Sequence, residues 1–322
     1  MAQLSILELA TVGSGKTTGE ALEESVAMVQ AAEASGYHRC WVAEHHGMAG
    51  VASSAPAVLL AHLAAKTSTI RVGSGGVMLP NHAPLVVAEQ FGTLEALHPH
   101  RIDLGLGRAP GTDQRTARAL GRGNADRFPE DVVELVSYFT GTSQVLAMPG
   151  KDLLPEIWLL GSSTYSATLA AHLGLPFAFA YHFAPDLLDA AVSLYRSNFT
   201  PSFLLGEPRV MVAATVLCAD SDAEAEQLAI PSRLATLLLR TGKPAQFPSP
   251  QEAAAYPFTA AEEALINAAA SSHIIGGPAT VKAGIEALVE RTGADEIMVS
   301  TRVYDVADRI RSIQRIAEAC AA

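Results

Sequence analysis

The sequence predicts a (β/α)8 barrel, an α/β fold in which eight parallel strands alternate with helices. The first observation is that short runs rich in Val, Ile and Leu alternate with segments whose apolar residues recur at helical spacing. The second is that a chain of 322 residues is long enough for one large barrel. A doubly wound sheet would usually have fewer strands and a switch point, so the strand count favours the barrel.

The first half of the chain supplies four of the predicted units. In the first helix, Leu22, Val26, Val29 and Ala32 fall on one face, and Gly36 ends it. The fourth helix has Pro129 at its first turn, where proline is favoured. The strands are expected at residues 4–10, 39–44, 70–79 and 101–107, and the helices at 20–35, 56–66, 84–97 and 129–139.

The second half completes the barrel. Strands are expected at residues 156–160, 177–180, 209–218 and 296–300, with helices at 166–173, 280–290 and 306–319. Four prolines stand among alanines in residues 241–272. We interpret this segment as an excursion at the barrel mouth within a single domain of residues 1–322, between strand seven and the last barrel helix.

Composition restricts the partners. The chain is 49% hydrophobic and 17% charged, below the usual share of roughly a quarter charged, so either the core is large or a homodimer covers one face. A net charge of −11 without a basic run argues against nucleic acid. Cys40, Cys218 and Cys320 are far apart, which favours reduced thiols and a cytoplasmic location. The sequence shows no secretory signal and no membrane span.

The third strand contains the first candidate site. Glycine weakens a strand unless the backbone bends or lies close to another group. Gly75 and Gly76 together are explained by a ligand lying flat against the strand, and a simple β-bulge is the alternative.

Glu44, His45 and His46 end the second strand, where barrel enzymes place their chemistry. Histidine exchanges protons near neutral pH, so a catalytic or ligand-contacting role is favoured over a structural one. Adjacent histidines point to opposite sides of an extended chain, and this disfavours a metal site.

The ends of strands four and five form a candidate anion site. Residues 161–166 read GSSTYS at a helix start, and Arg108 ends the neighbouring strand. Exposed N–H groups, several hydroxyls and a guanidinium suit a phosphate, whereas a plain helix cap needs one hydroxyl.

Residues 10–17 match a relaxed phosphate-binding loop that includes Lys16. The strict pattern requires glycine where Ala10 stands, and Gly19 falls where the helix should continue. A polar loop at the barrel mouth is therefore favoured over a nucleotide site.

Several of these stretches, in one order, resemble the bacterial luciferase-like family of flavin-dependent monooxygenases. The resemblance is strong over residues 4–185, returns at 275–302 and is weak in the excursion. The matching runs are WVAEHH (41–46), VGSGGVMLP (72–80), AEQF (88–91), RIDLGLGR (101–108) and GLP (174–176).

The resemblance implies reduced FMN in a (β/α)8 barrel, with a cis peptide at Gly75-Gly76 under the isoalloxazine. It places Glu44 and His45 near the reacting oxygen, with His45 as proton shuttle. The phosphate-side positions that it implies are Arg108, Ser162, Ser163 and Ser166, with Tyr165 a weaker candidate. Bacterial luciferase itself has a reactive cysteine where this chain has Gly107, so no thiol shares in the chemistry there.

By resemblance, reduced FMN would add O2 at its C4a carbon, and this peroxyflavin would oxygenate a small organic substrate, as in alkanal monooxygenase. The chain lacks a GxGxxG motif at a βα turn, so reduced FMN would come from a separate flavin reductase. The alternatives are an F420-dependent oxidoreductase, since relatives with this barrel use F420, and a non-catalytic flavin-binding protein.

Overall fold

Eight parallel strands close into a ring in the order β1-β2-β3-β4-β5-β6-β7-β9, which confirms the predicted barrel. The computed structural model describes residues 2–121 and 123–321. A ninth short strand, β8, pairs with the end of β7 outside the ring. The strands are β1 (Gln3–Glu8), β2 (Arg39–Val42), β3 (Arg71–Met78), β4 (Ile102–Gly107), β5 (Glu156–Gly161), β6 (Phe177–Ala180), β7 (Val210–Cys218), β8 (Ile274–Gly276) and β9 (Glu296–Ser300).

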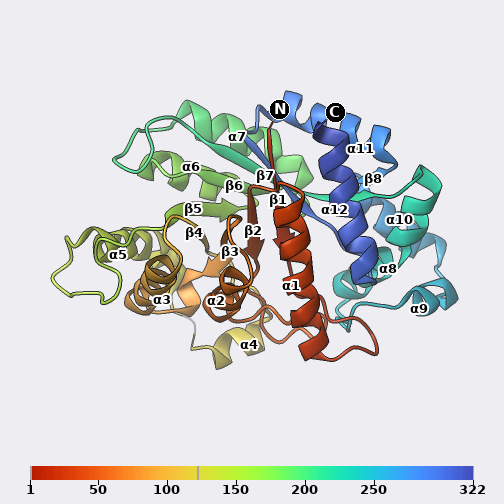
Figure 1. Ribbon diagram of the computed structural model, residues 1–322, viewed down its shortest axis with the longest axis horizontal. Helices are drawn as coiled ribbons and strands as arrows, with labels where there is room; N and C mark the ends of the chain where they lie inside the picture. Colours follow the sequence, from red (N-terminus) through yellow and green to blue (C-terminus); the bar gives the residue numbers. More distant parts are fainter. Residues whose placement is uncertain (1, 122, 322) are drawn as a thin grey trace.

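Helices cover the outside of the ring (Figure 1). As parallel strands covered on both sides require, every residue of β2, β4, β7 and β9 is buried. The helices are α1 (Thr18–Ala34), α2 (Pro56–Ala65), α3 (Pro84–Leu97), α4 (Gln114–Ala119), α5 (Phe128–Thr140), α6 (Thr164–Leu173), α7 (Leu188–Ser197), α8 (Asp222–Arg240), α9 (Pro250–Ala255), α10 (Ala260–Ala270), α11 (Pro278–Thr292) and α12 (Val306–Ala321), with 3-10 turns η1 (Leu79–Asn81), η2 (Ala125–Arg127) and η3 (Pro185–Leu187).

Some predicted boundaries need correction. The first strand was expected to reach residue 10 but ends at Glu8, because Ala10 has a positive φ of 48°. The helix expected from residue 166 begins at Thr164, because Ser163 is extended at its N-cap. The sequence reading also missed β8, α4, α7, α8, α9 and α10.

The excursion folds onto α8. Leu234 and Leu237 of α8 pack with Ala253 of α9 and Ile266 of α10 in a small core of their own. We call α8, α9, α10 and the segments between them the cap. The segment between α8 and α9 reaches the loop after β1, where Ser14 N donates to the Phe247 carbonyl at 2.8 Å.

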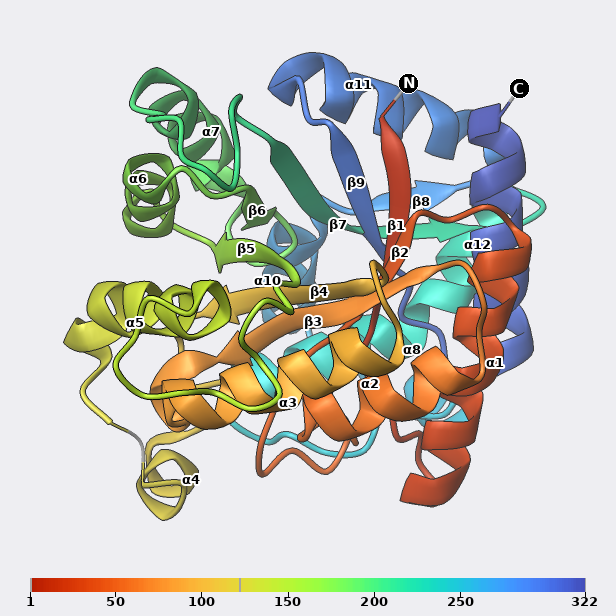
Figure 2. The same cartoon turned by 60° about the vertical axis from the view of Figure 1, so that its left-hand side comes forward.

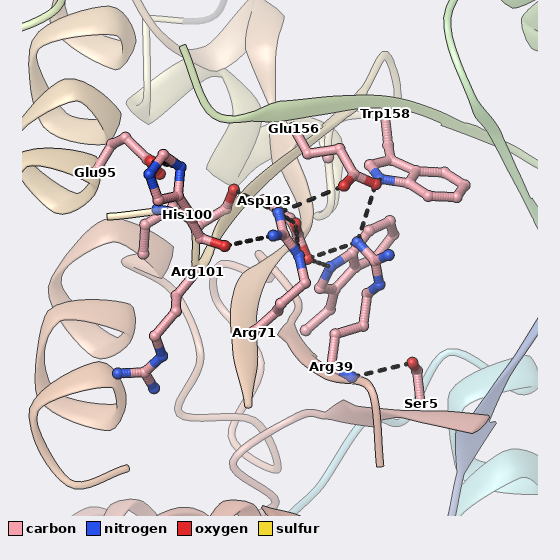
Figure 3. Close-up of polar contacts among 12 residues, drawn as sticks. Ser5, Arg39, Arg71, Glu95, His100, Arg101, Asp103, Glu156 and Trp158 are labelled. Atoms are coloured by element: carbon pink, nitrogen blue, oxygen red, sulfur yellow. Dashed lines mark hydrogen bonds and ion pairs between the residues drawn. The ribbon is translucent and has the colours of Figure 1, made fainter. Parts of the chain in front are cut away.

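A charged network closes the N-terminal end of the barrel (Figure 3). Arg39, at the start of β2, contacts Asp103 at 2.8 Å and Glu296 at 2.9 Å. Trp41 and Trp158 stack edge to face above it, with ring centroids 5.6 Å apart, and donate to Asp103 and Glu156 respectively. The network and this aromatic layer form the barrel floor.

No helix in the described part of the chain is long and apolar enough to cross a membrane.

Candidate active site

A cavity of about 340 Å³ occupies the C-terminal end of the barrel, above Trp41 and beneath the cap. This volume falls within the range of about 300–1,000 Å³ typical of small-molecule sites. Its wall is largely apolar, with contributions from β1, β2, β3, β5, β6, β7 and β9. Its lining includes two arginines and three histidines, and no Asp or Glu among the described residues.

Gly75 lines this cavity, and the Gly75-Gly76 peptide is cis, as the resemblance implied. The pairing of β3 with β4 also shifts between Gly75 and Val77, so the bulge held open as an alternative is present as well. A Cβ at Gly76 would lie 2.7 Å from the Gly105 carbonyl oxygen. Close packing against β4 therefore requires glycine at this position, whatever lies in the cavity.

His45 lies in the cavity wall just after β2. Its Nδ1 is 3.3 Å from the Gly111 carbonyl, an acceptor, so Nδ1 carries the proton and Nε2 keeps a free lone pair. Burial lowers the pKa of His45, which keeps the ring neutral at neutral pH. A neutral imidazole held in this tautomer can accept a proton from a group in the cavity.

His182, which follows β6, is arranged in the same way. Its Nδ1 donates to the Ala213 carbonyl at 2.9 Å, and burial lowers its pKa to about 4. The sequence reading missed this residue, although it stands two positions beyond a strand end, the signal that identified His45.

Glu44 lies outside the cavity wall, fully buried, and holds several polar groups together. Its carboxylate accepts from His46 at 2.9 Å, and from His82 and the Met78 N–H at 3.0 Å. Burial alone would raise its pKa, but these hydrogen bonds outweigh it and lower the pKa. Glu44 thus ties the end of β2 to the end of β3.

The predicted phosphate-side residues follow the ends of β4 and β5, and none of them is among the described residues that line the cavity. The Arg108 guanidinium stands over the Tyr165 ring, 4.4 Å from its centroid. Ser163 is the N-cap residue of α6 but makes no side-chain capping bond. Ser162 is exposed, and the buried Ser166 packs against Gly161, where an added Cβ would lie 2.3 Å from its hydroxyl oxygen. We call Arg108 and the start of α6 the anion cradle, since these are the groups predicted to hold a phosphate and the N-cap residue leaves the first helix N–H groups without its side chain as acceptor. That role stays a prediction.

Lys16, from the phosphate-loop look-alike, forms a 2.5 Å ion pair with Glu24 and lies over the Tyr304 ring. It thereby connects the loop to α1 and to the segment after β9, which favours the polar-loop interpretation.

Two further basic residues in the cavity wall were missed. Arg302 follows β9, and His273 precedes β8. Burial lowers the pKa of both side chains, that of His273 to about 4.

Residues 2–121 and 123–321 contain no group of three or more His, Cys, Asp or Glu side chains arranged to hold a metal ion.

Residues 2–296 match the family model described as luciferase-like monooxygenase. The relatives include the uncharacterized protein YvbT of Bacillus subtilis, 51% identical over 98% of this chain and 96% of that protein. A luciferase-like monooxygenase of Escherichia coli K12 is 48% identical, covering 96% and 94%. The N-acetyl-S-alkylcysteine monooxygenase of B. subtilis is 39% identical, covering 80% and 79%.

Among solved structures, apo-MsnO8 superposes with a TM-score of 0.92 at 35% identity, covering 99% of this chain and 98% of that one. The oxygenating constituent of 3,6-diketocamphane monooxygenase from Pseudomonas putida, solved with FMN, gives a TM-score of 0.74 at 21% identity, covering 99% and 97%. At that identity the likeness shows the fold alone.

Proposed function

Because the chain belongs to the luciferase-like monooxygenase family, we propose that it uses reduced FMN and O2 to oxygenate a small organic substrate. The supporting observation is the apolar cavity lined by Gly75 and His45, which opens at the same C-terminal end of the barrel strands where Arg108 and α6 form the anion cradle. One site can thus take an aromatic ring system, a phosphate and an apolar substrate.

The residues present fit FMN. The cradle at α6 suits a phosphate, since it offers uncapped N–H groups and the Arg108 guanidinium. The flat glycine segment of β3 and the apolar wall suit a ring system. When bound, reduced FMN supplies the two electrons that activate O2, so that one oxygen atom enters the substrate and the other leaves as water.

In this scheme the protein contributes water exclusion and proton handling. The apolar wall and the cap keep bulk water from the reacting groups. The His45 Nε2 accepts and returns a proton. Glu44 is a positioning residue, because it fixes the backbone around His45 and β3 without reaching the cavity.

Oxygen uptake tests the proposal directly. Mixing the protein with photoreduced FMN and candidate substrates should consume O2 and yield oxygenated product, whereas deazaflavin F420H2 should give no product. Hydride transfer with F420H2 would instead support an F420-dependent oxidoreductase. FMN binding without any turnover would support a flavin-binding protein.

We propose further that reduced FMN comes from a separate flavin reductase, given the missing GxGxxG motif. Activity should then depend on an added reductase and NAD(P)H, and any reductase that releases free FMNH2 should suffice. Oxidation of NADPH by the isolated chain with FMN would refute this.

We also propose a homodimer through α2 and α3, which lie side by side (Figures 1 and 2). Val58 is 73% exposed and Leu97 is 63% exposed on these helices, although large apolar side chains are usually buried. Sedimentation should show twice the monomer mass for the parent and the monomer mass for Val58→Asp. A monomeric parent at micromolar concentration would exclude the dimer.

A further inference from the structure

Arg302 is a partly buried cation, and no acidic side chain pairs with it among the described residues. Its Nε is inaccessible to solvent and has no hydrogen-bond partner, and within the described chain its guanidinium forms no ion pair. Its guanidinium lies over the Phe247 ring, whose centroid is 5.6 Å from Cζ. A charged donor that is shielded from water and has no acceptor is costly, so an anionic ligand that accepts from this Nε–H would stabilise the site.

The described residues that line the cavity around Arg302 include no anionic side chain. The chain as a whole has a net charge of −11. The cavity wall is therefore basic inside an acidic protein. This contrast favours an anionic ligand.

A small branch leads off at this point, called here the polar branch after the residues that it shares with the main cavity. The rest of its lining is mostly apolar and consists of Leu217, Ala229, Arg233, Ile266, Ala270 and Ile275. An adjoining cavity of about 20 Å³ shares five residues with the main one, and all five are polar. They are Thr215, Ser232, Thr236, His273 and Arg302. Hydroxyls, an imidazole and a guanidinium around so small a space suit the oxygens of a compact anion.

The position of Arg302 separates it from the cradle for the FMN phosphate. Arg302 follows β9 and Arg108 follows β4, and these strands are four places apart in either direction around the closed ring. The two guanidinium groups thus belong to opposite sides of the barrel mouth, with His45 and Gly75 contributing to the cavity wall between them.

We propose that Arg302 and the polar branch bind a carboxylate of the organic substrate. The substrate class is then an apolar molecule with one carboxylate, whose apolar part lies along the cavity wall toward His45 and Gly75. The carboxylate subsite deepens the proposed function. It rests on that function for the role of the bound molecule as substrate and for FMN as the second ligand.

Hexanoate and its neutral counterpart hexanamide are suitable probes, and their binding is measured by calorimetry with and without FMN. The parent protein should bind hexanoate about tenfold or more tightly than hexanamide, the scale of a charge-assisted hydrogen bond. Arg302→Gln should abolish this preference and leave FMN affinity within about twofold. Arg302→Lys should keep part of it, because the charge remains but the planar fork is lost.

Arg240→Gln is the matched control, because Arg240 also lines the cavity but is exposed. It should retain the preference for hexanoate. Equal binding of hexanoate and hexanamide by the parent protein would overturn the proposal. This measurement does not depend on whether a variant folds. Loss of FMN affinity in Arg302→Gln with an unchanged hexanoate preference would also overturn it and assign Arg302 to the flavin.

Probe binding and oxygen uptake are independent measurements. A selective loss of hexanoate binding in Arg302→Gln supports the carboxylate subsite even if reduced FMN gives no turnover. That second result would count against the monooxygenase function alone.

Discussion

Arg108 is the residue that should separate FMN from riboflavin, because it stands at the anion cradle and not in the cavity wall. Arg108→Ala should weaken FMN binding by about 1.5 to 3 kcal/mol, the scale of a charge-assisted contact, and leave riboflavin nearly unchanged. Fluorescence titration with both ligands measures this. Arg115→Ala, an exposed site on α4, is the control. Equal losses for the two ligands would remove Arg108 from the phosphate site.

His45 should affect turnover far more than flavin binding. His45→Ala should slow oxygenation of the substrate, followed with substrate present, by about a hundredfold or more, the usual scale for losing a general acid or base, with nearly parental FMN affinity. Stopped-flow mixing of the reduced enzyme with oxygenated buffer gives the rate. His182→Ala provides the comparison, because the two rings are held in the same tautomer. If only His182→Ala is slow, the proton-transfer role belongs to His182.

Sequence reasoning identified His45 because it belongs to a dense motif at a strand end. His182 and Arg302 also stand just beyond strand ends, but each is isolated among ordinary residues. Only closure of the ring brings β6, β9 and β2 around one cavity. In the linear sequence these residues are far apart, and nothing in it indicates that they share one site.

Among the elements, the contact of β3 with β4 leaves no room for a side chain at Gly76. The Cβ of Gly76→Ala would meet the Gly105 carbonyl at 2.7 Å, and β4 cannot withdraw without losing its pairing with β3. We expect a loss of about 1–3 kcal/mol in the free energy of unfolding, typical of overpacking. Urea denaturation measures it. Gly206→Ala, with open space around it, should be nearly neutral. If Gly76→Ala is as stable as the parent protein, β4 moves aside to accommodate the added Cβ.

The eight ring strands were predictable because each lies in a short, mostly apolar run between helical patterns. The amphipathic spacing of α7 was also present, since Leu188, Ala191, Val192 and Tyr195 share its buried face, but it was overlooked. The cap is a different case. Pro231 lies inside α8, and prolines are scattered through the following alanine-rich segment. These local signals oppose helices, which tertiary packing stabilises here.

For the whole molecule, buried histidines predict loss of stability in mild acid. Burial lowers the pKa of His182 and His273 to about 4, whereas both titrate near 6.5 when unfolded. Between pH 6.5 and 4 the unfolded chain therefore binds more protons than the folded one. The free energy of unfolding should fall with decreasing pH by up to about 1.4 kcal/mol per pH unit for each histidine.

Urea denaturation at several pH values tests this expectation. His182→Asn should reduce the slope of the free energy of unfolding against pH. His62→Gln, on the exposed side of α2, is the control for simple loss of an imidazole. An unchanged slope in His182→Asn would show that His182 does not contribute.

The sealed barrel floor constrains the order in which ligands can come and go. Arg39, its carboxylate partners and the two tryptophans close one end, which leaves the mouth as the shared entrance for flavin and substrate. A substrate that lies above the flavin must arrive second and leave first. A substrate that arrives early occupies the entrance in a dead-end complex. Excess substrate should therefore slow turnover at low FMNH2, and raising FMNH2 should relieve this inhibition.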